Sequence, residues 1–275
     1  MSAGIPGAGP SKTHDFAITD RHAVFLDLPV TFRFDLVGQG MPDAWDDGCA
    51  ARIGIMELDR PGHVRWLGID PCYVLHVGSA HTDAPGRIVL DGARYSAADT
   101  VAMWSRLGGA TPATPATPAA DAAALGVARL HRWTLDPATG SVTETARDDR
   151  PVEFPTLDDR LVGRASRYLH AVSDGADAPS AAEARGIAAI VEYDDATGAA
   201  DTHPLDAAAG EAVFVPAQDG TAEDDGWLLT ITTRRDGSAS QLLVLDAADL
   251  AGPAVAAVTL PRGVPAGFHR SWIED

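Results

Sequence analysis

The sequence predicts an all-β protein built from antiparallel hairpins. Most of the chain consists of short β-branched or alternating apolar runs of strand length, separated by turn signals such as Pro-Gly, Asp-Gly and Thr-Gly. Strong amphipathic helix patterns are scarce. Repeated hairpins of this kind fit a β-sandwich or a β-propeller. The sequence has no clean internal repeat, so its periodicity does not count propeller blades.

The predicted strands follow one another along the whole chain. In order they are 23–36, 51–58, 63–69, 87–95, 128–136, 188–194, 211–217, 227–235 and 241–250. Three hairpin turns stand out between them, at DPATG (136–140), at DDATG (194–198) and at Asp236-Gly237. Each turn joins two segments with strand patterns, so we expect antiparallel pairing across it.

Two segments interrupt the strand pattern. Residues 110–124 (ATPATPATPAADAAA) form an Ala/Thr/Pro-rich stretch whose prolines forbid a central strand, which predicts an extended surface loop. A domain linker is the alternative, but the strand pattern continues unchanged on both sides. Residues 178–186 fit either a short helix or a loop. We therefore predict a single domain over residues 1–275.

Composition narrows the function classes. The 275 residues are 45% hydrophobic, enough for a sizeable core, and carry a net charge of -18. Such an acidic surface repels phosphate backbones, which argues against a nucleic-acid partner. Cys49 and Cys72 are the only cysteines and are predicted to be free thiols, which fits a reducing cytoplasm. The richness in Ala, Asp, Arg and Gly indicates a bacterial source. No signal peptide or membrane-spanning apolar run is recognised.

Three of the nine histidines have distinctive surroundings. His14, His76 and His269 each lie at the end of an apolar segment beside turn residues. Histidine is the commonest side-chain metal ligand, and the separations between these three are too long for a zinc finger or an HExxH site. They suit ligands gathered from different blades of a propeller. Five others are predicted to be ordinary strand or loop residues: His22, His63, His131, His170 and His203. For His81 two readings stay open, a competing polar group or a residue at the rim of the site.

Two glutamates are candidates for orienting such ligands. Glu153 lies in DDRPVEFPTLDDR, and Glu223 lies in the acidic stretch AEDDG that follows EAVFVP. A metal-bound imidazole commonly donates its other N–H to a carboxylate, which fixes the ring. Composition alone leaves the alternative that both are solvated acidic residues near turns.

Several segments, in this order, resemble the carotenoid cleavage oxygenase family. They are HDFAITDRHAVFLDLPV, EFPTLDDR, EAVFVP with AEDDGWLL, LLVLDAADL and LPRGVPAGFHRSW. The family includes apocarotenoid and lignostilbene oxygenases and the retinoid isomerase. The resemblance implies a seven-bladed β-propeller with Fe(II) held by four histidines on its axis. It also implies cleavage of a conjugated C=C bond of a carotenoid, apocarotenoid or stilbene by O2, giving carbonyl products.

The resemblance also assigns residues. His14, His76 and His269 correspond to the second, third and fourth iron ligands, for one Fe(II) per chain, while Glu153 and Glu223 correspond to two of the orienting glutamates. Three phenylalanines adjoin these motifs, and two roles stay open for each, lining an apolar substrate tunnel or packing the core: Phe16, Phe154 and Phe268.

The chain departs from the family pattern in two places. After His76 it has Ser79, His81 and Thr82 where the family has an Asn, an aromatic and an acidic residue. Residues 1–13 contain no histidine or glutamate to match the first ligand. We therefore expect the chain to match the C-terminal three-fifths or so of a family member, an incomplete propeller lacking N-terminal blades.

Two functions follow as hypotheses. The first is an iron-dependent dioxygenase in the cytoplasm, acting on an apolar small molecule with O2 and taking up substrate through peripheral membrane contact. The alternative is a non-catalytic or degenerate propeller fragment that keeps only part of the iron site.

Overall fold

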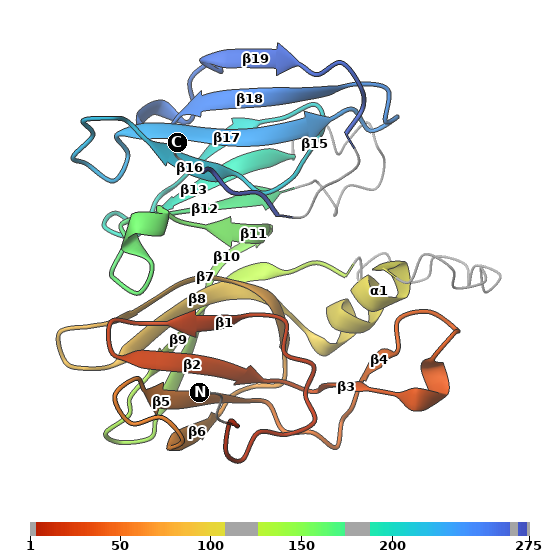
Figure 1. The fold of residues 1–275 in the computed structure, drawn as a ribbon, viewed down its shortest axis with the longest axis vertical. Coiled ribbons are helices and arrows are strands. Elements are labelled where there is room, and N and C mark those ends of the chain that lie inside the picture. Colours follow the sequence, from red (N-terminus) through yellow and green to blue (C-terminus); the bar gives the residue numbers. More distant parts are fainter. Residues whose placement is uncertain (1–3, 108–125, 174–187, 265–268, 274–275) are drawn as a thin grey trace. The chain divides into compact units, whose positions relative to one another are not determined.

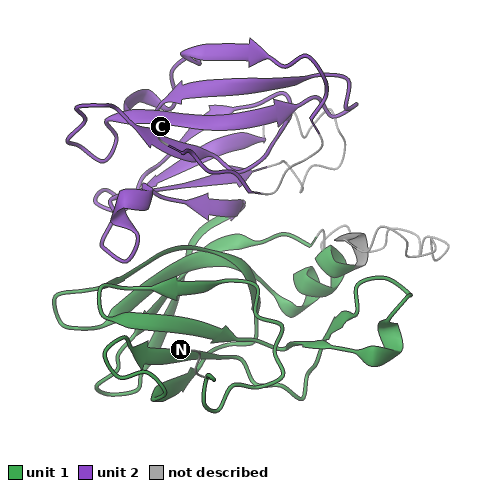
Figure 2. Ribbon diagram, in the orientation of Figure 1, with its two compact units in different colours: residues 1–149 green, residues 150–275 purple. Residues whose placement is uncertain are grey.

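The computed structural model describes residues 4–107, 126–173, 188–264 and 269–273. They form mostly antiparallel β-sheet, which confirms the all-β prediction. The chain divides into two compact units, residues 1–149 and residues 150–275, coloured separately in Figure 2. Each unit is described by itself, and the single domain over residues 1–275 stays a prediction.

The first sheet of unit 1 has the strand order β1-β2-β5-β6 (Figure 1). Its strands are β1 (Phe16–Ile18), β2 (His22–Asp27), β5 (Arg52–Glu57) and β6 (Val64–Gly68). A separate hairpin of β3 (Val30–Phe32) and β4 (Asp43–Trp45), with the short 3-10 helix η1 (Phe34–Leu36), is inserted between β2 and β5. The predicted strand at 23–36 is therefore broken, at Pro29, which lacks the N–H that a continuous ladder needs.

The second sheet of unit 1 is a four-stranded meander in the order β10-β9-β8-β7. Its strands are β7 (Tyr73–Thr82), β8 (Ile88–Tyr95), β9 (Arg129–Leu135) and β10 (Val142–Pro151). Apolar side chains of both sheets share one core, in which Val24, Ile53, Ile88 and Trp133 are fully buried. β1 lies against β7, so the first strand of one sheet adjoins the first strand of the next.

One helix follows β8 and was not predicted. It is α1 (Ala97–Leu107). Ser96 precedes it and accepts a hydrogen bond from the Asp99 N–H through its Oγ at 3.1 Å, the geometry of a helix N-cap. The Ser-Ala-Ala-Asp sequence is a recognisable cap signal, but the apolar positions after it are too few for a clear helical stripe.

Unit 2 contains two further antiparallel sheets. The first has the order β11-β12-β13-β14, with β11 (Glu153–Thr156), β12 (Tyr168–Ser173), β13 (Ala189–Asp194) and β14 (Ala200–Pro204). The second is built on β17 (Gly226–Thr233), β18 (Ser240–Asp246) and β19 (Ala256–Thr259), with β15 (Ala208–Ala209) and β16 (Val213–Pro216) both pairing with β17. The 3-10 helices are η2 (Asp159–Leu161) and η3 (Ala247–Asp249). Ile190, Leu228 and Leu245 are buried in the core of this unit.

The predicted hairpins are confirmed. β13 pairs with β14 and β17 pairs with β18 in continuous antiparallel register, and β9 neighbours β10 in its sheet. Gly140, Gly198 and Gly237 take positive φ values of 81°, 73° and 72° in the three turns, a conformation that glycine adopts at little cost. The predicted loop at 110–124 and the segment 178–186 lie outside the described residues.

Both cysteines are free thiols, as predicted. Cys72 is fully buried, and burial raises its pKa to about 12, which makes it an unreactive core residue. Among the described residues, no helix is long and apolar enough to cross a membrane.

Candidate metal centre

His14 and His76 lie side by side in unit 1. Their ring centroids are 5.0 Å apart and their planes are nearly perpendicular, at 86°. Two imidazoles bound to one metal through Nε2, with bonds of about 2.1 Å, have ring centres roughly 5 Å apart. The spacing of these two predicted ligands therefore fits a shared first-row metal ion.

The His14 ring is held in one orientation by the backbone. Its Nδ1 lies 3.0 Å from the Leu75 carbonyl oxygen. A carbonyl only accepts, so Nδ1 carries the hydrogen and the lone pair is on Nε2. A hydrogen bond from Nδ1 to a backbone carbonyl is the usual way in which a metal-binding histidine is oriented. Since Leu75 directly precedes His76, this bond also joins the two histidine segments.

Asp15 provides a second link between the two segments. Its Oδ2 accepts a hydrogen bond from the Val77 N–H at 2.9 Å, and its Oδ1 accepts one from the Phe16 N–H at 2.7 Å. Asp15 follows His14, and Val77 follows His76, so the carboxylate fixes the residues next to both rings. Sequence reasoning missed this role, although Asp15 stands inside the HDF motif.

His76 occupies an irregular part of β7. The register with β8 shifts between Val74 and Val77, where Leu75 and His76 together face one residue, Ala93. A bulge of this kind turns side chains away from the alternation of a regular strand and is frequent next to active sites. The bulge exposes the Leu75 carbonyl and sets His76 beside His14.

In unit 2, His269 lies next to Glu211. The His269 Nδ1 is 3.5 Å from the Glu211 Oε1. The other carboxylate oxygen of Glu211 accepts the Arg270 N–H at 2.8 Å, and the Arg270 guanidinium donates to the Glu211 backbone carbonyl at 2.9 Å. Burial lowers the pKa of Arg270 from its ordinary value. Glu211 thus anchors the backbone immediately after His269 as well as facing its ring.

Glu211, which was not a predicted site residue, is the carboxylate beside His269 among the described residues, and the orienting role of Glu223 stays a prediction. The Glu223 carboxylate instead accepts hydrogen bonds from the Ser166 hydroxyl at 3.0 Å and the Arg167 N–H at 2.7 Å. It stabilises the chain entering β12, whereas the carboxylate found beside His269 is that of Glu211. Sequence reasoning passed over Glu211, although it is the first residue of the EAVFVP motif.

Glu153 and Phe154 lie at a second bulge. Between Glu153 and Thr156 the register with β12 shifts, so Phe154 and Pro155 face a single residue. Phe154 has φ 54°, a left-handed conformation that costs a bulky residue roughly 1–3 kcal/mol. The Glu153 Oε2 accepts the Phe154 N–H at 2.6 Å. The Phe154 ring meets the His269 ring edge-on, with centroids 5.9 Å apart and planes at 83°. The orienting role of Glu153 stays a prediction.

The residues that depart from the family pattern have local partners. Ser79 donates to Asp91 at 3.3 Å, and Thr82 donates to the Thr19 hydroxyl at 3.1 Å. Asp91 in turn forms a bidentate pair with Arg132, at 2.8 and 2.6 Å. These polar contacts stabilise the sheet around β7 without involving the histidine pair.

The three phenylalanines predicted to lie near the site have different surroundings. Phe16 is 56% exposed, stacks on Phe25 with centroids 6.4 Å apart, and lines an apolar cavity of about 280 Å³ together with Ile5 and Trp66. Phe154 packs against the core of unit 2 and against His269. Phe268 lies outside the described residues. The tunnel role therefore stays a prediction, and Phe16 has the surroundings that suit it best.

The described residues bring together part of the predicted ligand set. His14 and His76 form a pair in unit 1, and His269 with Glu211 forms a separate cluster in unit 2. In the part of the chain that the structure describes, no group of three or more His, Cys, Asp or Glu side chains is arranged to hold a metal ion. The donor chemistry nevertheless fits a first-row transition metal, iron included, because His14 presents an Nε2 lone pair beside a second imidazole.

His14 lies two residues before β1 and His76 lies in β7, the first strands of two successive antiparallel sheets. The family model described as RPE65, retinal pigment epithelial membrane protein, matches residues 2–274. The chain belongs to this family, that of the carotenoid cleavage oxygenases. The Synechocystis apocarotenoid oxygenase structures match it with a TM-score of up to 0.79 at 28% identity, over 96% of this chain and 53% of theirs. This confirms the predicted propeller fold of the carotenoid oxygenase type.

Curated relatives agree with this placement. A carotenoid cleavage oxygenase of Mycobacterium tuberculosis is 32% identical over 98% of this chain and 59% of its own length. The apocarotenoid-15,15'-oxygenase of Synechocystis is 32% identical over 95% and 51%. An isoeugenol monooxygenase of Pseudomonas nitroreducens is 29% identical over 94% and 54%. The chain thus spans about half the length of the relatives it matches. A cobalt-substituted Synechocystis oxygenase is among the similar structures, at 29% identity and TM-score 0.77 over 96% of this chain and 53% of that one.

Proposed function

We propose that this chain forms part of an Fe(II)-dependent oxygenase that cleaves a conjugated C=C bond with O2 and releases carbonyl products. The observation that carries the proposal is the perpendicular His14–His76 pair, with the His14 Nδ1 engaged by the Leu75 carbonyl. Membership of a family whose named relatives are oxygenases supports the reaction class.

The chain's own residues have defined parts in this proposal. His14, His76 and His269 bind the metal through neutral imidazole nitrogens, while the Leu75 carbonyl and the Glu211 carboxylate orient two of the rings. Bound iron supplies redox chemistry with O2 that no protein side chain provides. Asp15 keeps the two histidine segments together.

The proposed substrate is an apolar molecule with a conjugated double bond. Named relatives act on carotenoids, apocarotenoids and isoeugenol, so a polyene leads and a phenylpropenoid is the second candidate. The cavity lined by Phe16 and Phe25 is also lined by Thr13, the residue before His14, and it offers the apolar and aromatic walls that such a substrate needs.

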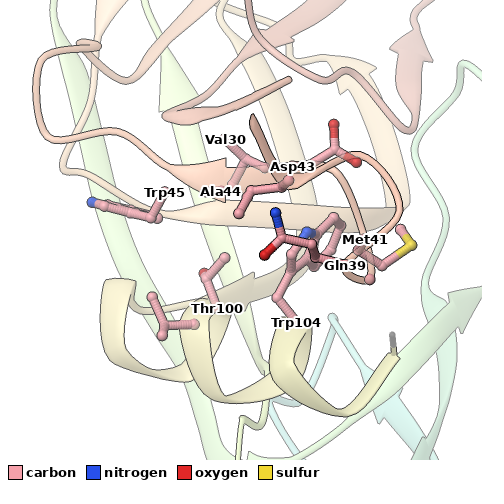
Figure 3. A pocket seen from close by; sticks show the side chains of 11 residues that line it. Val30, Gln39, Met41, Asp43, Ala44, Trp45, Thr100 and Trp104 are labelled. Carbon is pink, nitrogen blue, oxygen red and sulfur yellow. The ribbon is translucent and has the colours of Figure 1, made fainter. Parts of the chain in front are cut away.

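A groove in unit 1 supports peripheral membrane contact for substrate uptake. Figure 3 shows Thr100 and Trp104 of α1 on one side of it and Ala44 and Trp45 of β4 on the other. Its volume is about 230 Å³. Beside it, the loop between β3 and β4 exposes apolar side chains, Phe34 being 86% exposed. Exposed aromatics of this kind bind at the boundary between headgroups and acyl chains.

The membrane contact is tested by co-sedimentation with uncharged phosphatidylcholine vesicles, since the net charge of -18 repels anionic lipid. The wild-type chain is expected to sediment with the vesicles and Phe34→Ser to remain largely in solution. Val162→Ser, which removes an exposed apolar side chain of unit 2, is the matched control. Equal sedimentation of all three proteins would contradict the proposed contact.

The metal site is tested by anaerobic titration with Fe(II) and Co(II). His14→Ala and His76→Ala are each expected to weaken metal binding at least tenfold, and the exposed His63→Ala is the control. Metal affinities unchanged in both variants would show that the ligand assignment is wrong. Oxygen consumption with an apocarotenal or isoeugenol then tests the reaction. Metal binding without substrate-dependent oxygen uptake would favour the non-catalytic alternative. The cytoplasmic location stays a prediction.

A further inference from the structure

Phe154 combines an unfavourable backbone with a specific contact. It is the one non-glycine residue with positive φ among those the structure describes. Glycine reaches this conformation at no steric cost, whereas a bulky side chain does not. Pro155 follows and restricts the preceding backbone further. Because the backbone at this position favours glycine, a phenylalanine here indicates that the ring itself has a role.

The surroundings show where the ring is directed. Pro155 is buried, and the Phe154 N–H is taken up by the Glu153 carboxylate at 2.6 Å, so the bulge is fixed on both sides of Phe154. With the backbone fixed, the ring stands edge-on to the His269 imidazole at 5.9 Å. Edge-to-face packing at this distance is a favourable aromatic geometry. Glu211 approaches the same imidazole at its Nδ1.

We propose that Phe154 is a positioning residue for His269: its left-handed bulge holds the ring edge-on against the imidazole, so that His269 keeps its Nδ1 toward Glu211 and its Nε2 available for metal. This rests on the proposed metal-binding function of His269. The His269 side chain is 54% exposed, and the Phe154 ring forms a wall on one side of this partly covered imidazole. Glu211 approaches the ring at one atom, Nδ1, at 3.5 Å, and a contact at one atom does not fix the plane of a ring.

A competing explanation is that the ring only packs the core of unit 2, to which Phe154 also belongs. Two substitutions separate the explanations. Phe154→Leu keeps an apolar side chain of similar size and removes the aromatic edge. Phe154→Gly removes the ring and relieves the backbone. Phe214→Leu is the matched control, because Phe214 is a buried aromatic residue of the same core and its described ring contact is with Arg160.

The first readout needs no metal. In protein labelled with 15N-histidine, ring nitrogen shifts report the tautomer of each imidazole, and His269→Ala identifies the signals of His269. Wild type and Phe214→Leu are expected to hold His269 mainly as the Nδ1–H tautomer. Phe154→Leu and Phe154→Gly are expected to shift it toward the mixture of a free imidazole. The wild-type tautomer ratio in Phe154→Leu would overturn the proposal and leave Phe154 a core residue.

The second readout is Co(II) affinity, followed by visible absorption. Phe154→Leu and Phe154→Gly are expected to bind Co(II) about tenfold more weakly than wild type, with Phe214→Leu unchanged. Affinities equal to wild type in both Phe154 variants would also overturn the proposal. If the wild-type chain itself binds no Co(II), the proposed metal site fails, while the tautomer measurement still decides the role of Phe154.

Discussion

His131 makes the stability of unit 1 depend on pH in a predictable direction. Its side chain in β9 is 14% exposed and packs against the ring of Trp133, with centroids 4.7 Å apart. Burial, and secondly the positive charge of Arg94, lower the pKa of His131 from 6.5 to about 4. The folded protein therefore keeps this imidazole neutral over a range in which the unfolded chain protonates it.

The sign and size of the effect follow by linkage. Below pH 6.5 the unfolded state takes up a proton that the folded state refuses until about pH 4, so stability falls as the pH falls through this window. Each pH unit costs at most about 1.4 kcal/mol, which gives about 3 kcal/mol by pH 4. The charges of Asp70 and Asp91 raise this pKa and offset part of the effect of burial.

The assay is urea unfolding of wild type and His131→Gln between pH 7 and pH 4, with the exposed His63→Gln as control. Carboxylates titrate in the same range, so the informative quantity is the stability difference between wild type and variant. That difference is expected to change by up to about 3 kcal/mol in favour of His131→Gln as the pH falls. A difference that stays constant to within about 0.5 kcal/mol would refute the reasoning, because it would mean that His131 titrates alike in both states.

Two further predictions concern packing. In the folded protein the His170 Nε2 lies 2.8 Å from the buried Glu192 carboxylate, so His170→Leu leaves that carboxylate without this partner and is expected to lower the free energy of unfolding by about 3–5 kcal/mol in urea unfolding. The double variant His170→Leu/Glu192→Leu is expected to regain most of the lost stability. Additive losses in the double variant would contradict this prediction. Gly54→Ala places a Cβ 2.6 Å from the Trp66 ring and is expected to cost about 1–3 kcal/mol, while Gly68→Ala, in open space on the neighbouring strand, is nearly neutral. Equal melting temperatures for Gly54→Ala and Gly68→Ala would show that the Trp66 ring can move aside without a loss of stability.

The strands were predictable because their signals are local. Alternating or β-branched runs bounded by Gly and Pro coincide with β5, β6, β8, β9, β13 and β17, whereas the strand predicted at 241–250 ends at Asp246, where η3 begins. The hairpin turns at 136–140 and 194–198 were likewise evident from their Asp and Gly residues. The helix α1 was missed because its cap at Ser96 is strong but its apolar stripe is short. The propeller came from the resemblance and not from the strand pattern, which fits a sandwich equally well.

The sequence predicted which histidines form the candidate site, but not which residues contact them. The sequence singled out His14, His76 and His269 from their positions at the ends of apolar segments. The sequence did not identify Glu211 as the neighbour of His269, because the residue that a carboxylate contacts depends on the tertiary packing of segments far apart in the chain. Glu223 was assigned from the family resemblance. Its carboxylate accepts a hydrogen bond from the backbone entering β12, and its orienting role stays a prediction.

The direction of the His76 and Phe154 side chains depends on β-bulges, which the alternation of apolar and polar residues along a strand does not predict. Strand patterns assign faces by counting in twos, and one extra residue reverses every later assignment. β7 contains such an extra residue at Leu75–His76, and β11 contains one at Phe154–Pro155. β7 and β11 are therefore bulged beside His76 and Phe154, whereas β13 and β17 pair with β14 and β18 in unbroken register. The geometry of His76 and Phe154 thus comes from departures from regular pairing, which become visible only once the partner strands are in place.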